Sequence, residues 1–422
     1  MDQAVLQPGE LQGIVNYTHC VHMPEDEHFA MATHVLQGNV ILPDRVLQHG
    51  LVAIEDGVIR SVSEAGAGRQ PTDDLGELYI APGFIDVHTH GIAGADTMDG
   101  SQESLSLMAR RFAAHGVTGF LATTMTQSLD VTTRAIRAVR RYMERQDEED
   151  QDHEPAARVL GIHLEGPWIS RDFKGAQNER FIVPPTEESV ATILAEGNGA
   201  ITIVTLAPEL PGAEQAMQTL RGQGICIALG HTGATYEQAL RAVELGATHV
   251  THCFNGMTGL HHRRPGVAGA ALLCDQLRAE IIADGIHVHS DVMRLLIHVK
   301  RRERVMLITD SMSATELSDG IYALGGQEVS VRAGRASLAD GTLAGSTLTL
   351  DRAVRNVIHL CGVPVHDAVY MASAVPAQAI GLGDRKGQIR AGYDADITIL
   401  NTDLQPVQVI VGKRPGVPCS GE

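Results

Sequence analysis

The feature that most restricts the fold is a regular alternation of short apolar segments with longer amphipathic ones. Continuous apolar runs predict buried strands, and the amphipathic stretches between them predict helices that cover a parallel sheet. Eight such repeats favour a closed (β/α)8 TIM barrel, of the α/β class, over an open sheet. The strands are predicted at residues 84–88, 118–123, 159–164, 201–206, 225–230, 248–252, 280–283 and 305–309. Helices are predicted at residues 104–115, 131–145, 187–196, 235–245 and 291–300.

The two ends of the chain share a different pattern, in which short strands are separated by turns. Strands are predicted at residues 35–42, 51–55, 58–62, 387–390, 395–400 and 407–412. We expect these pieces to pair into one small β-sandwich domain that flanks the barrel. The expected domains are a flexible tail (1–32), an N-terminal β-sandwich segment (33–80), the barrel (81–380), and a C-terminal β-sandwich segment with a tail (381–422). The acidic run at 146–154 is expected to be a solvated loop, and Gly325-Gly326 a hairpin turn.

Charge and composition exclude several classes of partner. The formal net charge of −18 disfavours non-specific binding to nucleic acid or to anionic membranes. No apolar run approaches the ~20 residues of a membrane span, and the first residues lack the basic and apolar segments of a signal peptide. The six cysteines are scattered without a Cys-x-x-Cys motif. We therefore expect a cytoplasmic protein in a reducing compartment, with no nucleic-acid or membrane partner.

Polar residues follow five of the predicted barrel strands, at the ends where barrel enzymes carry their chemistry. They are His88, His90, Glu165, His231, His252 and Asp310. A single residue of this kind commonly caps a turn or a helix. Six metal-competent groups at five strand ends are hard to explain in that way. On an extended backbone alternate side chains share a face, so His88 and His90 point to the same side.

The donor types predict a hydrolytic metal centre. Glu165, His231 and His252 suit one divalent ion with an open position for water. His88 and His90 suit a second ion, with Glu165 bridging the two. Asp310, a further metal-competent group, fits the base that takes a proton from water and returns it to the leaving group. Zinc is the favoured metal, and iron or manganese also suit these ligands, so we expect one or two ions per chain.

Several longer motifs give the chain a resemblance to a known family. They are Pro82 to Gly91, His163-Leu164-Glu165-Gly166-Pro167, Lys174-Gly175-Ala176, Gly230-His231-Thr232, Thr251 to Met257, Ala283 to His287 and Asp340 to Ser346. From about residue 33 to about residue 414 the chain resembles the amidohydrolase superfamily, and within it the family of N-acetylglucosamine-6-phosphate deacetylases. The resemblance implies a flanking β-sandwich and removal of acetate from an N-acetylamino sugar phosphate. It also implies that Glu165, His231 and His252 are metal ligands and that Asp310 is the catalytic acid and base.

The resemblance also implies a sugar pocket and a dimer. The pocket residues would be Ala176, Gln177, Asn255, Gly256, Asp284, Gly285, Ile286, His287, Leu343, Ala344 and Gly345. Arg263 would reach the substrate phosphate, in this family often from the neighbouring subunit, so a homodimer with a shared phosphate site is expected. A guanidinium fork matches phosphate oxygens. Without the family match, a solvated loop would be the favoured interpretation of Arg263.

Three departures from the family pattern leave alternatives open. Many members have Gln and Asn where this chain has His88 and His90, and hold one metal. Gln177 replaces a histidine that contacts substrate near the reacting amide, and a glutamine cannot carry charge. Arg264 replaces a glutamate. The alternatives are an amide hydrolase with another substrate, such as a different N-acetylamino sugar, a D-amino acid derivative or a cyclic amide, and a non-catalytic binding protein.

Overall fold

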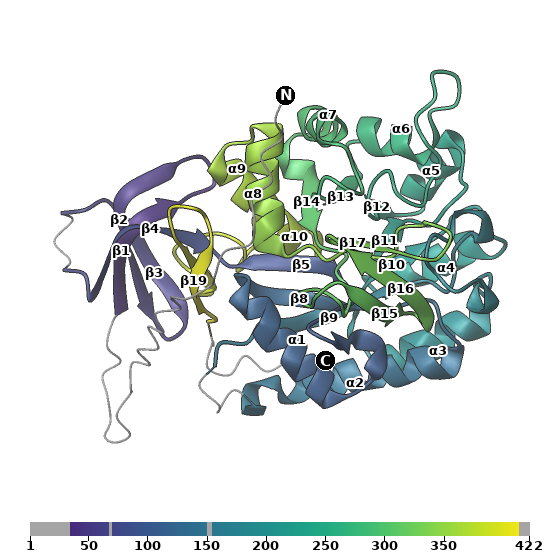
Figure 1. The fold of residues 1–422 in the computed structure, drawn as a ribbon, viewed down its shortest axis with the longest axis horizontal. Helices are drawn as coiled ribbons and strands as arrows, with labels where there is room; N and C mark the ends of the chain where they lie inside the picture. Colours follow the sequence, from purple (N-terminus) through teal and green to yellow (C-terminus); the bar gives the residue numbers. More distant parts are fainter. Residues whose placement is uncertain (1–33, 67–69, 150–153, 413–422) are drawn as a thin grey trace. The chain divides into compact units, whose positions relative to one another are not determined.

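The computed structural model describes residues 34–66, 70–149 and 154–412 (Figure 1). The tail predicted at 1–32 and the end of the C-terminal tail, 413–422, lie outside the described residues. The described residues form one compact unit. In the described chain, no helix is both long and apolar enough to cross a membrane.

Eight parallel strands form the central sheet, in the order β14-β13-β12-β11-β10-β9-β8-β5. The two edge strands meet, because the amide of Asp310 donates to the carbonyl of His88 at 2.9 Å. The chain is therefore a (β/α)8 TIM barrel with a flanking β-domain, and all eight predicted strands are confirmed to within a few residues. The strands are β5 (Phe84–Thr89), β8 (Val117–Thr123), β9 (Arg158–Glu165), β10 (Ile201–Leu206), β11 (Cys226–Leu229), β12 (Ala247–Val250), β13 (Arg278–Ile282) and β14 (Val305–Ile308).

Helices cover the outside of the barrel (Figure 1). The five predicted ones are α1 (Gln102–Ala114), α2 (Leu129–Glu149), α3 (Glu187–Gly197), α5 (Tyr236–Glu244) and α7 (Ser290–Lys300). Ser101, Thr186 and Thr235 cap three of them through their side-chain hydroxyls. Five further helices were not predicted: α4 (Ala213–Gly222), α6 (Gly266–Leu273), α8 (Leu350–Cys361), α9 (Val365–Ala372) and α10 (Ala374–Ala379). Nearly all of α6 is buried, so no polar face marks it as a helix.

The loop predicted at 146–154 is wrong over its first residues. Helix α2 continues through Glu149, while residues 150–153 lie outside the described chain. The side chain of Gln146 explains the extension. It donates to the carbonyl of Val159 at 3.2 Å and accepts from the amide of the same residue at 3.0 Å, so the helix end is fastened to strand β9.

The flanking domain is a six-stranded sheet built from both ends of the described chain, in the order β19-β18-β4-β1-β2-β3. Its strands are β1 (His34–Ile41), β2 (Val46–Glu55), β3 (Val58–Ser63), β4 (Asp73–Pro82), β18 (Ile397–Leu400) and β19 (Pro406–Ile410). The prediction that the two ends pair is confirmed, because β18 runs antiparallel to β4. Strand β4 was missed because its first half is largely polar and only its end is buried. The strand predicted at 387–390 is wrong: these residues form bends and irregular structure, Gly387 has φ +83°, and a Cβ there would lie 2.5 Å from the carbonyl oxygen of Ser373.

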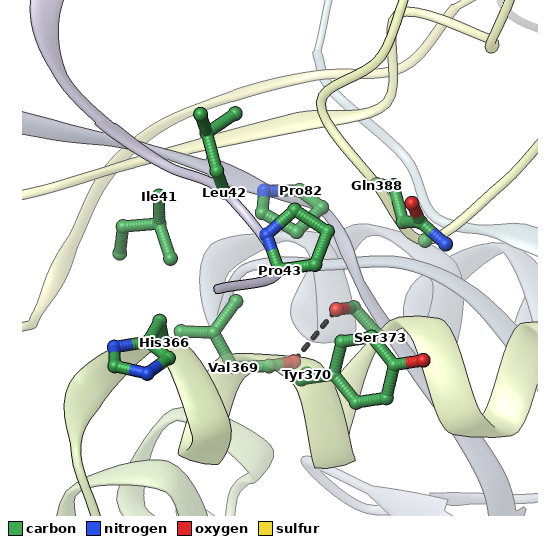
Figure 2. Close-up of a pocket in the computed structure, with 10 residues that line it drawn as sticks. Ile41, Leu42, Pro43, Pro82, His366, Val369, Tyr370, Ser373 and Gln388 are labelled. Atoms are coloured by element: carbon green, nitrogen blue, oxygen red, sulfur yellow. Dashed lines mark hydrogen bonds between the residues drawn. The ribbon is translucent and has the colours of Figure 1, made fainter. Parts of the chain in front are cut away.

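Gly83 joins the flanking sheet to the barrel. It is the single residue between β4 and β5, and a Cβ there would lie 2.2 Å from Thr118 Oγ1, so only glycine fits. Its amide donates to the carbonyl of Asp396 at 2.9 Å. A hollow of about 10 Å³ lies near the junction of the flanking sheet and the barrel, between residues such as Pro43, Pro82 and Tyr370 (Figure 2). That volume suits at most one water molecule, so this hollow is not a ligand site.

The remaining strands lie in two small antiparallel sheets. One consists of β15 (Gly320–Leu324), β16 (Gln327–Arg332) and β17 (Arg335–Ser337), and the predicted turn at Gly325-Gly326 joins the first two of these strands. The other pairs β6 (Gly91–Ile92) with β7 (Ala95–Asp96). Single turns of 3-10 helix stand at Thr97–Asp99, Arg171–Phe173, Glu179–Phe181 and Arg302–Arg304.

Candidate active site and metal centre

The six polar residues predicted at the strand ends lie together in the structure, and all six are buried. His88 lies in β5 and His90 directly follows it, whereas Glu165 is the last residue of β9. His231, His252 and Asp310 are each the second residue after a strand, β11, β12 and β14 respectively. The barrel closure therefore brings residues separated by more than 200 positions to one place.

The last three residues share an unusual backbone conformation. The φ angles are +47° at His231, +29° at His252 and +50° at Asp310. Residues other than glycine rarely adopt positive φ, and such conformations persist where the surrounding structure enforces them. Each strand thus ends in a sharp turn that directs one side chain into the mouth of the barrel.

Glu165 is the centre of the first group of donors. Its Oε1 lies 3.2 Å from His231 Nε2 and 3.2 Å from His252 Nε2. The two imidazole Nε2 atoms are themselves 3.2 Å apart. One atom from each residue lies within 4.8 Å of the others, which is the spacing of ligands around a single ion.

The second group joins His88, His90 and Asp310. Asp310 Oδ1 lies 3.2 Å from His90 Nε2 and 3.5 Å from His88 Nε2. Glu165 also contacts this group: its Oε2 is 3.4 Å from His90 Nε2, and its Oε1 is 3.4 Å from His88 Nε2. The two carboxylate oxygens of Glu165 thus face both groups.

The hydrogen bonds behind the imidazoles decide which ring nitrogen faces the centre. His231 Nδ1 lies 2.9 Å from the carbonyl of Phe173, and His252 Nδ1 lies 3.1 Å from that of Asn255. A carbonyl only accepts, so each Nδ1 carries the proton and each Nε2 presents a lone pair to the centre. His88 Nε2 is buried and has no hydrogen-bond partner within the described chain. This donor set fits a divalent cation.

Two carboxyl groups of the centre, those of Glu165 and Asp310, favour their ionised forms. Burial alone would raise the pKa of the Glu165 carboxyl, but the adjacent imidazoles hold that pKa well below its usual range. Burial likewise opposes ionisation of Asp310, yet the hydrogen bond with His90 and the charge of the neighbouring histidines lower its pKa to about 2. Both groups are therefore carboxylates at neutral pH, as metal binding and proton abstraction require.

A cavity of about 270 Å³ opens directly onto the two groups. Of the pocket residues implied by the family resemblance, Ala176, Gln177, Asn255, Gly256, His287, Leu343 and Gly345 line it. Gly256 has φ +57°, and a Cβ there would lie 3.0 Å from His231 Nδ1, so the loop can pass this close only as glycine. Met125, Gly175, Leu324 and Thr342 also line the cavity and were not predicted.

The other implied pocket residues do not line the cavity. Asp284 lies behind His287, whose Nδ1 is 2.7 Å from Asp284 Oδ2. Burial would raise the pKa of Asp284, but this hydrogen bond and the charge of His287 lower it. Gly285 and Ile286 lie in the same turn, and Ala344 is fully buried. The turn at residues 284–287 therefore supports His287, which is the residue of this turn that lines the cavity.

Gln177 is buried at the cavity wall with both ends of its amide occupied by protein. Its Nε2 donates to Glu165 Oε2 at 2.6 Å, and its Oε1 accepts from the amide of Thr126 at 2.8 Å. Gln177 therefore contacts one of the metal donors directly. The sequence did not predict this contact.

Arg263 lies outside this cavity. It borders a separate hollow of about 500 Å³ with Phe173, Tyr236 and Arg264. The Arg263 side chain is exposed, and its nearest described polar neighbour is His262. Within one chain, the structure does not bring Arg263 to the site.

Two buried carboxylates behind the centre were also missed. Glu280 Oε2 lies 3.0 Å from His88 Nδ1. Asp86 accepts from the amide of His88 at 3.2 Å and from the hydroxyl of Thr309 at 2.6 Å, and burial raises its pKa to about 7. The sequence did contain a signal for such a residue: Glu280 is charged and directly precedes two apolar strand residues, Ile281 and Ile282.

Comparison with known proteins agrees with this geometry. Residues 79–417 match the amidohydrolase family, and the chain belongs to that family, which is metal-dependent. The chain is 40% identical to the N-acetylglucosamine-6-phosphate deacetylase of Lysinibacillus sphaericus, over 86% of this chain and 92% of that protein. It is 37% identical to the N-acetylgalactosamine-6-phosphate deacetylase of Escherichia coli O157:H7, over 89% of this chain and 97% of that one. The crystal structure of N-acetyl-D-glucosamine-6-phosphate deacetylase from Mycobacterium smegmatis superposes with a TM-score of 0.84, at 32% identity, covering 90% of this chain and 98% of that chain.

Proposed function

We propose that this chain hydrolyses N-acetyl-D-glucosamine 6-phosphate to D-glucosamine 6-phosphate and acetate. The observation that carries the proposal is a pair of buried metal-donor groups beside a cavity large enough for one sugar ring. Relatives named N-acetylglucosamine-6-phosphate deacetylase match nearly the whole chain and support the choice of substrate. The reaction breaks the amide C–N bond, joins a water oxygen to the acetyl carbon and leaves a proton on the amine.

The metal donors divide into two sets. Glu165, His231 and His252 would hold one divalent cation, and His88, His90 and Asp310, with Glu165 bridging, would hold a second. A bound cation would supply Lewis acidity that polarises the amide carbonyl and acidifies water. Imidazole and carboxylate donors suit zinc best, and also iron or manganese.

Asp310 would act as the general base and acid. Its low pKa makes it a carboxylate at neutral pH, and it lines the cavity beside His90. It would accept a proton from the attacking water and deliver it to the amine nitrogen as the C–N bond breaks. Asn255 and His287, with the backbone of Gly256 and Gly345, would hold the sugar from the cavity walls.

Arg263 would serve the 6-phosphate from a second copy of the chain. It is exposed on a separate hollow and so is available to a neighbouring molecule. We therefore propose a homodimer with a shared phosphate site. We also propose a reducing cytoplasmic location, which the free state of the four described cysteines supports.

The galactosamine isomer is the second candidate substrate, because one relative at 37% identity is named for it. Acetate release separates the candidates. The metal-loaded chain should be given the 6-phosphates of N-acetylglucosamine and N-acetylgalactosamine, both sugars without phosphate and an N-acetyl D-amino acid, while hydrolysis of a cyclic amide is followed separately by its ring opening. Highest kcat/KM on N-acetylglucosamine 6-phosphate supports the proposal. Preference for another substrate would overturn the choice of N-acetylglucosamine 6-phosphate, and neither acetate release nor ring opening by chain with bound metal would favour a binding protein.

A further inference from the structure

We propose that Glu280 is a positioning residue that holds His88 in place as a ligand, and through it sets the affinity of the second cation site. The inference rests on the proposed function, because it concerns the metal centre assigned there. Glu280 lies on β13, on the opposite side of His88 from the centre, and does not line the cavity. It would act through His88 and does not touch substrate.

The geometry singles out the bond between Glu280 and His88. Glu280 Oε2 lies 3.0 Å from His88 Nδ1, and both side chains are fully buried. A carboxylate accepts this hydrogen bond, so the proton stays on Nδ1 and the lone pair of Nε2 faces Asp310 and Glu165. The Nδ1 atoms of the other three histidines in the two groups lie near backbone carbonyls. His88 alone among the four is backed by a charged group.

The complete burial of the Glu280 carboxylate is energetically unfavourable by itself. Burying a carboxylate is costly unless it is paired, and Glu280 Oε1 has no hydrogen-bond partner within the described chain. A residue that served only packing would be an apolar one, like the neighbouring Ile281 and Ile282, which are buried without polar atoms in their side chains. A carboxylate behind a ligating imidazole makes the ring a stronger donor, which compensates for that cost when a cation is bound.

Glu280 also touches the first donor group, though less closely. The same Oε2 accepts from the backbone amide of His252 at 3.3 Å. The ring of His252 keeps its own partner, the carbonyl of Asn255, at 3.1 Å. Loss of the Glu280 carboxylate should therefore weaken the second site strongly and the first site little.

The test is metal binding by the full-length chain, without any substrate. Chelator-treated wild type and Glu280→Gln are titrated with Co²⁺, with visible absorption and elemental analysis as the readouts. Wild type should take two ions per chain. Glu280→Gln should take the first ion nearly unchanged and the second about 10- to 100-fold more weakly, as is typical when such a supporting residue is lost. Glu280→Leu, which removes the acceptor altogether, should weaken the second ion further.

Asp351→Asn is the matched control, since it also neutralises a buried carboxylate, one that pairs with His115 and not with a metal donor. It should keep both ions. Equal affinities in wild type and Glu280→Gln, equal weakening of both ions, or a wild type that never binds a second ion would each overturn the proposal. If Glu280→Leu does not fold, the glutamine variant still decides. Two bound ions without acetate release would instead count against the proposed function alone.

Discussion

Asp310 lines the cavity and contacts His90, so its carboxylate is placed to exchange protons with a bound substrate. Replacement by asparagine keeps the shape and an oxygen that can still face the histidines, but an amide cannot accept the proton. We expect Asp310→Asn to lower kcat by about 10²- to 10⁴-fold, while KM for the sugar phosphate changes little. Steady-state kinetics on protein with its metal content measured will check this. Turnover close to wild type in metal-replete protein would contradict the assignment of the base.

Gln177 can be tested as a support for Glu165. Gln177→Leu keeps a similar volume but removes the 2.6 Å hydrogen bond to Glu165 Oε2. If Gln177 mainly positions Glu165, kcat or metal affinity should fall about 10- to 100-fold, with little change in KM. If it mainly binds substrate, KM should rise while the metal content stays the same. Leu324→Met is the control, because Leu324 lines the same cavity and its side chain makes no hydrogen bond to Gln177 or Glu165.

At the scale of the elements, the strands were predictable and their terminal turns were not. Apolar runs mark the eight barrel strands because a barrel strand is buried on both faces, and parallel strands place their carboxyl ends together. That reasoning located His231, His252 and Asp310 beside one another. It could not give their positive φ angles, or the inward pairing of Gln177 with Glu165, because both depend on contacts between segments distant in sequence. Helix α6 was missed for a similar reason: its burial removes the polar face that sequence patterns detect.

One ionic joint fastens helix α1 to the start of α8. His115, at the end of α1, contacts Glu316 and lies 3.1 Å from Asp351. Burial would lower the pKa of His115, but these two carboxylates raise it. Burial would raise the pKa of Asp351, yet His115 and its other partners lower it to about 2, and Arg111 with His115 lowers that of Glu316. Each partner in this joint therefore favours the charged form of the other.

The pH dependence of this joint follows from the signs of the shifts. A raised histidine pKa stabilises the fold fully below the unfolded value of about 6.5, and the effect is lost as pH rises through the folded pKa. Lowered carboxyl pKa values stabilise above about pH 4, and that effect is lost as pH falls through the folded values. His115→Gln should therefore reduce the melting temperature most between about pH 5 and 6.5, and less at alkaline pH. Paired melting curves at fixed metal concentration test this, and a difference independent of pH would contradict it.

At the scale of the whole molecule, the feature to be tested is the proposed phosphate site shared between two copies of the chain. The barrel and the flanking sheet were predictable because each has its own hydrophobic pattern, and Gly83 joins them without a linker. A contact between two copies has no such signal in one chain. Arg263 stands outside the cavity of its own chain, exposed beside Arg264. Its proposed role at the 6-phosphate therefore requires a neighbouring subunit.

The proposed phosphate role of Arg263 is tested first with variants of this chain alone. Loss of a charge-assisted contact to phosphate costs about 1.5–3 kcal/mol, or about 10- to 100-fold in kcat/KM. Arg263→Ala, or the double change with Arg264→Ala in case the neighbour compensates, should lower kcat/KM by this factor on N-acetylglucosamine 6-phosphate. On N-acetylglucosamine without the phosphate the change should be small. Equal proportional losses on both substrates, or no loss on either, would contradict the assignment.

Mixed dimers then show which chain supplies the arginine. Asp310→Asn has no competent base, and the Arg263→Ala/Arg264→Ala chain has no phosphate contact, so each homodimer should be poor on the phosphorylated substrate. If the arginine acts across the interface, a dimer of one chain of each kind contains one complete site, because the chain with intact Asp310 receives Arg263 from its partner. Such dimers, isolated by two different affinity tags, should regain about half of the wild-type kcat/KM, since one of two sites works. If Arg263 served its own chain, both sites of the mixed dimer would be defective and no activity would return. A tagged mixture of wild type with Asp310→Asn controls for tagging and assembly, and it should reach the same half value under either arrangement.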